Sequence, residues 1–498
     1  MNIWEKSTPF PRTQYDLVIS RHYQDFASFL QSPSDINSIS LSYLPKSKSE
    51  QFFKQFLEKI DSFFANINVL KLAHSYVNLE IFGNIFLKTN LRKIKNLELV
   101  SVNINDEKME EILKQLEFLE FLSLKNNKSI SDKTLKMMRD CKFKLKALDL
   151  NNCLITDEGI DEMDSDSFSD IQYLNLSKTH ISFLNGFNDN SFLKNIRSLD
   201  ISYNKLNFKS ILNLLESQFF NNLSYLDISH NESYEPKETF SEMLGLLINK
   251  ETKFPNLTHL AMTHNYIIDS DLLTFLTPNS FPSLLHLNLQ NNNIKISSLA
   301  PISNELLSLS LENCEIIFDN LEKVNFSNLK SLNLNNVVDL SDEGLLKLSK
   351  CFSDKIEFLC LANCNLTKDS ISCLNEKTFI KGINLRGNPL NDDGAQLIIN
   401  SKFFYDLEYL GLNECGLAEG LIEVFKEIHE KPKIQDLRLG GNRLNTSIMT
   451  ELAMFLIEWD SLKRMNIGSW ECLNDFEGKM EMEAKGVEIL PMIGDELD

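Results

Sequence analysis

The chain has 498 residues, more than one compact core usually contains, so it holds either several globular domains or one repeating array. Its 50 Lys and Arg against 70 Asp and Glu give a net charge of -20, which disfavours nucleic acid and anionic lipid as main partners, because both need clustered positive charge. No apolar run approaches the length of a membrane span, and residues 1–12 lack the apolar core of a secretion signal. We expect a soluble protein without membrane insertion.

The nine cysteines are an odd number and are not packed at the density of a disulfide-stapled domain. This usage predicts reduced thiols and a cytosol-like location. In chain order, residues 1–35 precede the first clear repeat, and the mixture of apolar and polar residues over 15–30 predicts an N-terminal cap. Residues 50–60 have helical periodicity and are assigned to the first repeat.

From residue 36 to 470 one phrase recurs, Leu-x-x-Leu-x-Leu-x-x-Asn or Cys-x-Leu. We count about seventeen copies at a spacing of roughly 27 residues. The clearest copies begin at Leu145, Ile196, Leu284, Ile356, Leu407 and Ile434.

Each phrase predicts a short strand whose leucines point into a core while the intervening residues point outward. The Asn or Cys then turns inward and bonds backbone groups of the turn. Acidic loops at residues 156–160, 341–345 and 391–395 lead into helical patterns, where they would cap the helix starts. Metal binding is the alternative role for these loops, and their recurrence in several repeats favours capping.

The alternation of Cys364, Asn388, Cys415 and Asn442, with the acidic loops and the spacing, resembles the ribonuclease-inhibitor class of leucine-rich repeats. That resemblance implies an α/β fold, a leucine-rich-repeat solenoid shaped as a horseshoe with a parallel concave sheet and convex helices. The class includes inhibitors, GTPase activators and innate sensors, so it implies no single function. Thr179 and Val337 depart from the strict alternation.

Residues 471–498 are acidic and predict a solvated C-terminal tail. A glutamate-rich C-terminal end also resembles that of effectors injected by intracellular bacteria, several of which carry leucine-rich repeats. Residues 231–238 lengthen one repeat just after its strand. This insertion is either a recognition loop or a change in repeat length that the fold tolerates without a function.

The outward strand positions in the middle of the array are rich in aromatic, imidazole and carboxylate groups. Tyrosines flanked by carboxylates would suit a basic or mixed surface on a folded partner, whereas strand propensity alone is the alternative account of the tyrosines. The predicted partner-binding residues are Asp149, Tyr173, Asp200, Tyr203, Tyr225, Asp227, His230, His259, His264 and His286.

The histidines leave two further possibilities open. His230 and His264 share one strand position, as do His259 and His286, so pairs could approach each other. A metal site would need a third or fourth ligand, and pH-dependent binding needs none. We therefore expect no metal and no cofactor.

No phosphate loop, Gly-x-Ser-x-Gly elbow, His-Glu-x-x-His helix or Cys-x-x-Cys pair is present. We therefore hypothesise that the protein is a non-catalytic protein-protein interaction scaffold that acts in a cytoplasm. A more specific form of this hypothesis is a bacterial effector that is secreted into the cytoplasm of a host cell. The alternative is a regulator of an enzyme, a GTPase activator or an inhibitor, since the repeats and acidic tail resemble the Ran GTPase-activating proteins without a matching catalytic residue. An enzyme with a site within the inner face is a third possibility.

Overall fold

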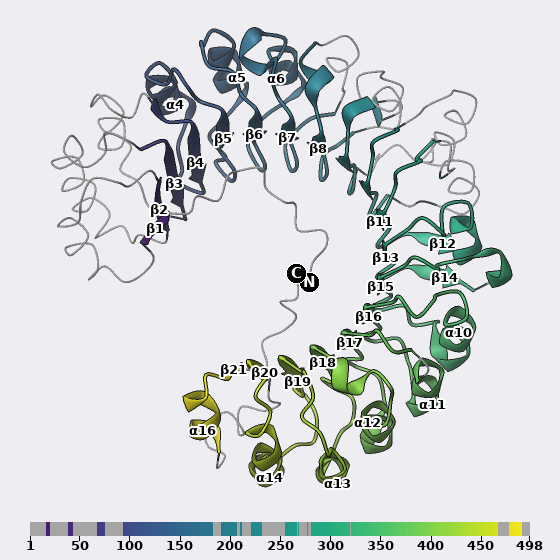
Figure 1. Cartoon of the computed structure of the whole chain (residues 1–498). Helices are drawn as coiled ribbons and strands as arrows, with labels where there is room; N and C mark the ends of the chain where they lie inside the picture. Colours follow the sequence, from purple (N-terminus) through teal and green to yellow (C-terminus); the bar gives the residue numbers. More distant parts are fainter. Residues whose placement is uncertain are drawn as a thin grey trace. The chain divides into compact units, whose positions relative to one another are not determined.

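The computed structural model describes residues 16–19, 38–42, 67–74, 93–182, 191–206, 210–211, 221–231, 254–265, 267, 276, 280–318, 320–375, 377–466 and 478–490. The chain forms two compact units, residues 6–258 and residues 259–498. In both units the strands lie on one side, the strand face, and the helices on the other, the helix face (Figure 1).

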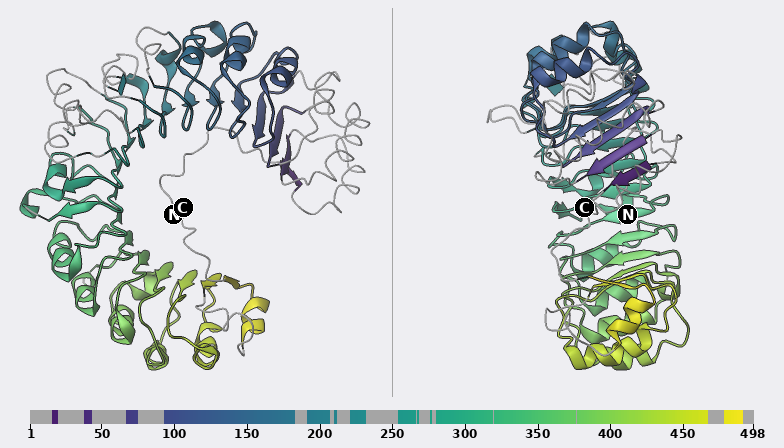
Figure 2. Two further views of the ribbon diagram at one scale, coloured as in Figure 1. Left: turned by 180° about the vertical axis from the view of Figure 1, so that it is seen from behind. Right: turned by 90° about the vertical axis from the view of Figure 1, so that its left-hand side faces the viewer.

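In the unit of residues 6–258 the strands are parallel and follow one another in chain order. The side view of Figure 2 shows the first of them lying side by side. They are β1 Asp16–Ile19, β2 Ser38–Ser42, β3 Val69–Ala73, β4 Asn96–Val100, β5 Phe121–Ser123, β6 Ala147–Asp149, β7 Tyr173–Asn175, β8 Ser198–Asp200 and β9 Tyr225–Asp227. The described helices are α4 Asp106–Leu113, α5 Asp132–Arg139 and α6 Asp157–Asp161, with 3-10 helices η2 Asp166–Phe168 and η4 Ser191–Asn195.

The unit of residues 259–498 repeats this arrangement with parallel strands. They are β10 His259–Ala261, β11 His286–Asn288, β13 Ser308–Ser310, β15 Ser331–Asn333, β16 Phe358–Cys360, β17 Gly382–Asn384, β18 Tyr409–Gly411, β19 Asp436–Arg438, β20 Arg464–Asn466 and β21 Glu488–Leu490. A separate pair joins β12 Asn293–Lys295 to β14 Glu315–Ile317. The helices are α10 Ser341–Leu348, α11 Lys368–Ile371, α12 Asn391–Ile399, α13 Leu421–Lys426, α14 Thr446–Leu456 and α16 Lys479–Ala484, with 3-10 helices η6 Ile296–Leu299, η7 Leu321–Lys323, η8 Ser372–Leu374 and η9 Phe404–Asp406.

A central apolar residue, which is leucine in most strands from β5 onward, fixes the register, as the repeat phrase predicts. Leu122, Leu148 and Leu174 are paired from strand to strand and are fully buried. In the other unit Leu309 and Leu332 are paired in the same way. Stacked repeats therefore share one continuous apolar core within each unit.

The inward Asn or Cys satisfies backbone groups of two repeats, which confirms the role predicted for it. The Asn127 amide donates to the carbonyls of Leu99 (2.6 Å) and Leu124 (2.7 Å), and its Oδ1 accepts the N–H of Val102 at 3.1 Å. Cys153 donates its thiol to the same Leu124 carbonyl at 3.2 Å. At the two departures from the pattern, Thr179 donates to the Leu176 carbonyl (2.8 Å) and Val337 is simply buried.

The acidic loops do not cap their own helices as predicted: the N-cap residues of α6, α10 and α12, which are Thr156, Leu340 and Leu390, make no side-chain capping bond. Their carboxylates bond the next repeat instead. Asp106, Asp132 and Asp157 each accept a backbone N–H and a hydroxyl from Ser or Thr of the next repeat. Asp342 does the same for Thr367. These carboxylates therefore tie neighbouring repeats together on the helix face.

Structure extends into both predicted terminal segments. Within residues 1–35, β1 pairs in parallel with β2. Within residues 471–498, predicted as a solvated tail, α16 and β21 form, and β21 pairs with β20. The helical run at 50–60 and residues 232–238 of the lengthened repeat lie outside the described residues. No helix in the described part combines the length and apolarity needed to cross a membrane.

Candidate functional site

Two columns of side chains run across the strand face of the unit of residues 6–258. Strand pairing brings the first residues of β5 to β9 into one column and the third residues into another. The first column is Phe121, Ala147, Tyr173, Ser198 and Tyr225, and the third is Ser123, Asp149, Asn175, Asp200 and Asp227.

The three aspartates in the third column are buried, contrary to the exposure that the sequence predicted. Asp149, Asp200 and Asp227 are 7%, 1% and 9% exposed. The Asp200 Oδ1 accepts the N–H (3.0 Å) and the hydroxyl (2.6 Å) of Ser202.

Three of the four other members of the third column make the same turn. Asp149 and Asp227 accept the N–H of Asn151 and Ser229, each at 3.0 Å. Asn175 does so with Ser177 at 2.9 Å. The neutral amide of Asn175 accepts the same hydrogen bond as the carboxylates, so the contact does not depend on charge. The side chains of this column therefore stabilise the turns that follow the strands.

The tyrosines of the first column differ in exposure. Tyr173 was predicted as outward-facing, but it is 5% exposed and packs against Ala147 and Phe121. Tyr225 is half-buried, and its hydroxyl donates to Asp227 Oδ2 at 3.4 Å. Burial first, and the nearby carboxylate second, raise the pKa of both phenols, so both stay neutral.

The most exposed aromatic residue of the predicted set lies in the turn after the strand, and the prediction had placed it on the strand itself. Tyr203 is 47% exposed and stacks on His230 with ring centroids 3.8 Å apart and an interplanar angle of 15°. The Lys178 Nζ lies 4.7 Å from the centre of the same tyrosine ring. Three successive repeats therefore build one column, Lys178, Tyr203 and His230, which we call the turn stack.

All members of the turn stack have left-handed backbone conformation, with φ of 57°, 56° and 53°. The two preceding repeats place Asn126 and Asn152 at this position, and asparagine tolerates that conformation. For Lys, Tyr and His it is strained by about 1 kcal/mol or more each, and such strain clusters at functional sites. Sequence reasoning missed Lys178, although a residue other than Asn or Gly just before the inward residue of the repeat would have been the signal.

The remaining predicted histidines lie in the unit of residues 259–498. His259 and His286 are paired across β10 and β11, and their rings stack at 4.1 Å and 17°. Burial, and then the neighbouring imidazole, lower the pKa of His259 to about 4, and burial lowers the pKa of His286. His264 has φ of 53° at the turn position, and its Nδ1 is 3.4 Å from Thr263 Oγ1. Among the described residues, no three His, Cys, Asp or Glu side chains gather in a way that could hold a metal ion.

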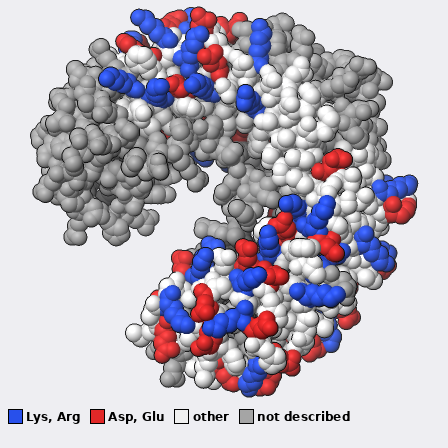
Figure 3. Space-filling view, viewed as in Figure 1, with Lys and Arg blue, Asp and Glu red and all other residues white. Residues whose placement is uncertain are grey.

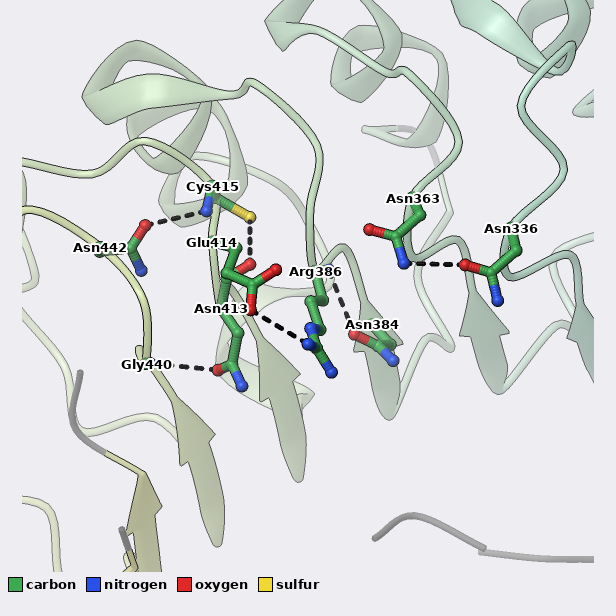
Figure 4. A network of polar contacts seen from close by, with 9 residues as sticks. All are labelled: Asn336, Asn363, Asn384, Arg386, Asn413, Glu414, Cys415, Gly440 and Asn442. Atoms are coloured by element: carbon green, nitrogen blue, oxygen red, sulfur yellow. Dashed lines mark hydrogen bonds and ion pairs between the residues drawn. The ribbon is translucent and has the colours of Figure 1, made fainter. Parts of the chain in front are cut away.

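Later turns of this unit place Asn or Gly at the left-handed position, with Glu414 as the exception. Figure 4 shows Asn363 donating to Asn336 across two repeats at 2.8 Å. Gly387 occupies the next such turn with φ of 69°. Glu414 follows, also left-handed, and pairs with Arg386 at 3.0 Å. An aromatic stack in the turns is thus peculiar to the repeats that contain Tyr203 and His230, among the turns that the structure describes.

The buried cysteines have a structural role. Cys364 and Cys415 donate to the carbonyls of Leu334 (3.0 Å) and Leu385 (3.1 Å), as Cys153 does to Leu124. Burial raises the pKa of each of these three thiols to about 12. In the described part of the chain the cysteines are free thiols.

Comparison with known proteins agrees with the repeat geometry. A family model described as Leucine Rich repeat matches residues 141–163, which run from the loop before β6 through α6. No curated protein matches the sequence.

The chain is also similar to three solved structures. A chain of the Rad7 and Elc1 complex in yeast is 15% identical, with a TM-score of 0.44 over 89% of this chain and 92% of that chain. The internalin inlF from Listeria monocytogenes is 14% identical, with a TM-score of 0.38; the match covers 84% of this chain and 95% of that chain. A chain of the TLR13–ssRNA13 complex is 18% identical, with a TM-score of 0.43; the match covers 91% of this chain and 70% of that chain. Likeness at this level carries no information about function.

The strand, turn and helix unit with its inward Asn or Cys defines a solenoid of repeats. The chain folds as a leucine-rich-repeat solenoid.

Proposed function

We propose that this protein is a non-catalytic interaction scaffold that holds a folded partner protein on the strand face of the unit of residues 6–258. The observation that carries the proposal is the turn stack of Lys178, Tyr203 and His230. It places a half-exposed tyrosine ring between a cation and an imidazole, in a backbone conformation that tyrosine adopts only at a cost.

The turn stack has the properties of an interface anchor. Stacking on both faces restricts the ring of Tyr203, so little side-chain entropy is lost when a partner covers it. Exposed, rigid tyrosines are enriched among the residues that dominate binding energy. Half-buried Tyr225 extends the same surface along β9.

The chemistry suits a partner surface that is basic or mixed. Asp227 is close enough to raise the pKa of Tyr203, after the larger effect of burial. The negative potential of Asp227 therefore reaches this surface, although its Oδ1 holds a turn. An Arg or Lys of the partner at the exposed edge of the tyrosine ring would gain from this negative potential.

Affinity capture from a eukaryotic lysate with quantification of the bound proteins tests this proposal. The Tyr203→Ala, His230→Ala double variant should lose the captured partner. Leu154→Ala, at an apolar side chain that is 45% exposed in the same unit, is the matched control and should retain it. A partner that is captured equally by wild type and the double variant contradicts the proposed face.

We also propose a cytosol-like site of action and, as its finer form, delivery into a host cell as a bacterial effector. Free, buried thiols support the first part, and the acidic C-terminal composition supports the second. Fusing the chain to a reporter enzyme that is active only in host cytosol tests delivery. Replacing Asp495, Glu496 and Asp498 by amides should abolish the signal if the acidic end directs export, and an unchanged signal contradicts that role.

A further inference from the structure

One repeat of this acidic protein is strongly basic. Residues 125–146 contain eight Lys or Arg and two Asp, whereas residues 147–177 contain eight acidic residues and no Lys or Arg. All eight basic side chains are exposed. In Figure 3 blue and red side chains lie close together over the part of the molecule that carries α4 to α6. The whole-chain charge of -20 conceals this separation.

The basic residues lie on the outward side of α5 and on the loop that leads from it into β6. Helix α5 buries Thr134, Leu135 and Met138, so Lys136 and Arg139 point away from the core. Lys142 and Lys144 follow on the loop, beside the end of the helix, because α5 runs back toward the start of the next strand. These four side chains therefore form one end of the basic surface.

Most of this positive charge is uncompensated. Arg139 pairs with Glu162 at 2.5 Å, but Lys136, Lys142 and Lys144 form no ion pair within the described part of the chain. Several lysines on the loops and helices of the other unit are paired, as in Lys368 with Asp393 (2.7 Å) and Lys433 with Asp406 (2.6 Å). In a protein with excess carboxylates, unpaired lysines gathered on one repeat indicate a surface kept available for a negatively charged partner.

An exposed phenylalanine borders these lysines. Phe118 is 55% exposed on the loop before β5. Strand register places Lys93 and Lys144 at the equivalent positions of the preceding and following repeats, because each lies three residues before its paired strand residue. The ion pairs of Glu120 with Lys95 (3.0 Å) and Lys146 (2.6 Å) hold this row of loops together.

We propose that this surface, comprising Lys93, Phe118, Lys136, Arg139, Lys142 and Lys144, docks an acidic segment of a partner protein that carries an apolar side chain. The lysines meet the carboxylates, and the apolar side chain packs on Phe118. The surface lies on the helix face and on the loops entering the strands, away from the turn stack. Its test is therefore independent of the strand-face proposal.

The flanking repeats favour an acidic peptide over a nucleic acid or a lipid surface. Helices of adjacent repeats lie about 10 Å apart, so an extended polyanion would also cover the acidic residues of α4 and of residues 157–170. Repulsion there would oppose binding. A single acidic segment fits along the one basic repeat.

Fluorescence anisotropy with a labelled peptide of alternating glutamate and leucine tests the proposal on the full chain. We expect saturable binding that weakens as salt rises, and about tenfold weaker binding for the Lys136→Glu, Lys142→Glu, Lys144→Glu variant. The same peptide with lysine in place of glutamate gains nothing from this surface, so any binding it shows should not weaken in the triple variant. No binding of the acidic peptide, or equal binding by wild type and the triple variant, overturns the proposal.

A matched pair of variants tests the role of the aromatic ring. Phe118→Ala should weaken peptide binding severalfold. Phe379→Ala removes a ring that is 59% exposed on the loop before β17, where Lys381 is paired with Glu357 at 2.8 Å, and should leave binding unchanged. Tighter binding of single-stranded DNA or of anionic vesicles than of the acidic peptide overturns the choice of partner. Unchanged circular dichroism and melting temperature show that the variants are folded.

Discussion

The Asp132 carboxylate accepts two hydrogen bonds from Thr156 of the next repeat, one from its backbone N–H at 2.8 Å and one from its hydroxyl at 2.6 Å. An acidic residue in the first turn of one helix thus holds the start of the following helix. Because Asp106, Asp157 and Asp342 repeat the contact, it is a general connection between repeats.

Replacing Asp132 by alanine should lower stability. The change leaves the N–H and hydroxyl of Thr156 without their acceptor, at a cost of about 2 kcal/mol for hydrogen bonds to a charged group. The urea midpoint measured by circular dichroism should fall. Lys133→Ala, at the exposed neighbouring residue, is the control and should leave the midpoint nearly unchanged. Equal midpoints for both variants would show that the contact contributes nothing.

Residue 159 must be glycine because the side chain of Asp132 occupies the space that a Cβ atom would need. A Cβ at residue 159 would lie 2.2 Å from Asp132 Oδ1. Gly159→Ala should therefore destabilise the wild-type chain, and it should cost less in an Asp132→Ala background, where the colliding group is gone. A double-mutant cycle of urea midpoints measures this difference, and strictly additive effects would argue against the collision.

The turn stack should oppose stability. Replacing both Tyr203 and His230 by asparagine removes two strained left-handed residues, and each strain costs about 1 kcal/mol. It also loses one ring stack, which stabilises by about 1 kcal/mol. The relief of strain is therefore the larger effect. We expect the melting temperature to rise slightly while partner capture is lost. A marked fall in melting temperature would show that the stack stabilises the fold and needs no functional explanation.

The stacked histidines His259 and His286 should make stability depend on pH. The pKa of His259 is lowered from 6.5 to about 4, so the unfolded chain binds more protons between these values. The stabilisation is complete above pH 6.5 and is lost as the pH falls toward 4. Urea midpoints at several pH values should fall less steeply for a His259→Gln, His286→Gln variant than for wild type, and parallel curves would contradict the effect.

The buried thiols should resist alkylation. Burial raises the pKa of Cys153, Cys364 and Cys415 to about 12, so little thiolate exists near neutrality. Mass spectrometry after iodoacetamide treatment should find these residues unmodified in the native protein and modified in denaturant. Rapid modification without denaturant would contradict the burial that the repeat requires.

The sequence by itself determined the repeat and its register. Leu148 and Leu174 lie where the phrase predicts, and Asn127 and Cys153 turn inward as their side-chain chemistry requires. The reason is that the two-residue period of a strand and the inward polar residue are local features of the sequence, and both recur in nearly every copy of the repeat. The same local rules predicted that residues between the leucines point out of the core.

Only the tertiary structure decided which outward residues are exposed. Asp200 and Tyr203 are three residues apart and were both predicted to face a partner, yet one is buried in a turn and the other is half exposed. The exposure of each depends on the side chains of the preceding and following repeats, as does the reach of Asp132 to Thr156. Those neighbours lie about one repeat away in sequence, beyond any local pattern, so they become visible only when the repeats are stacked.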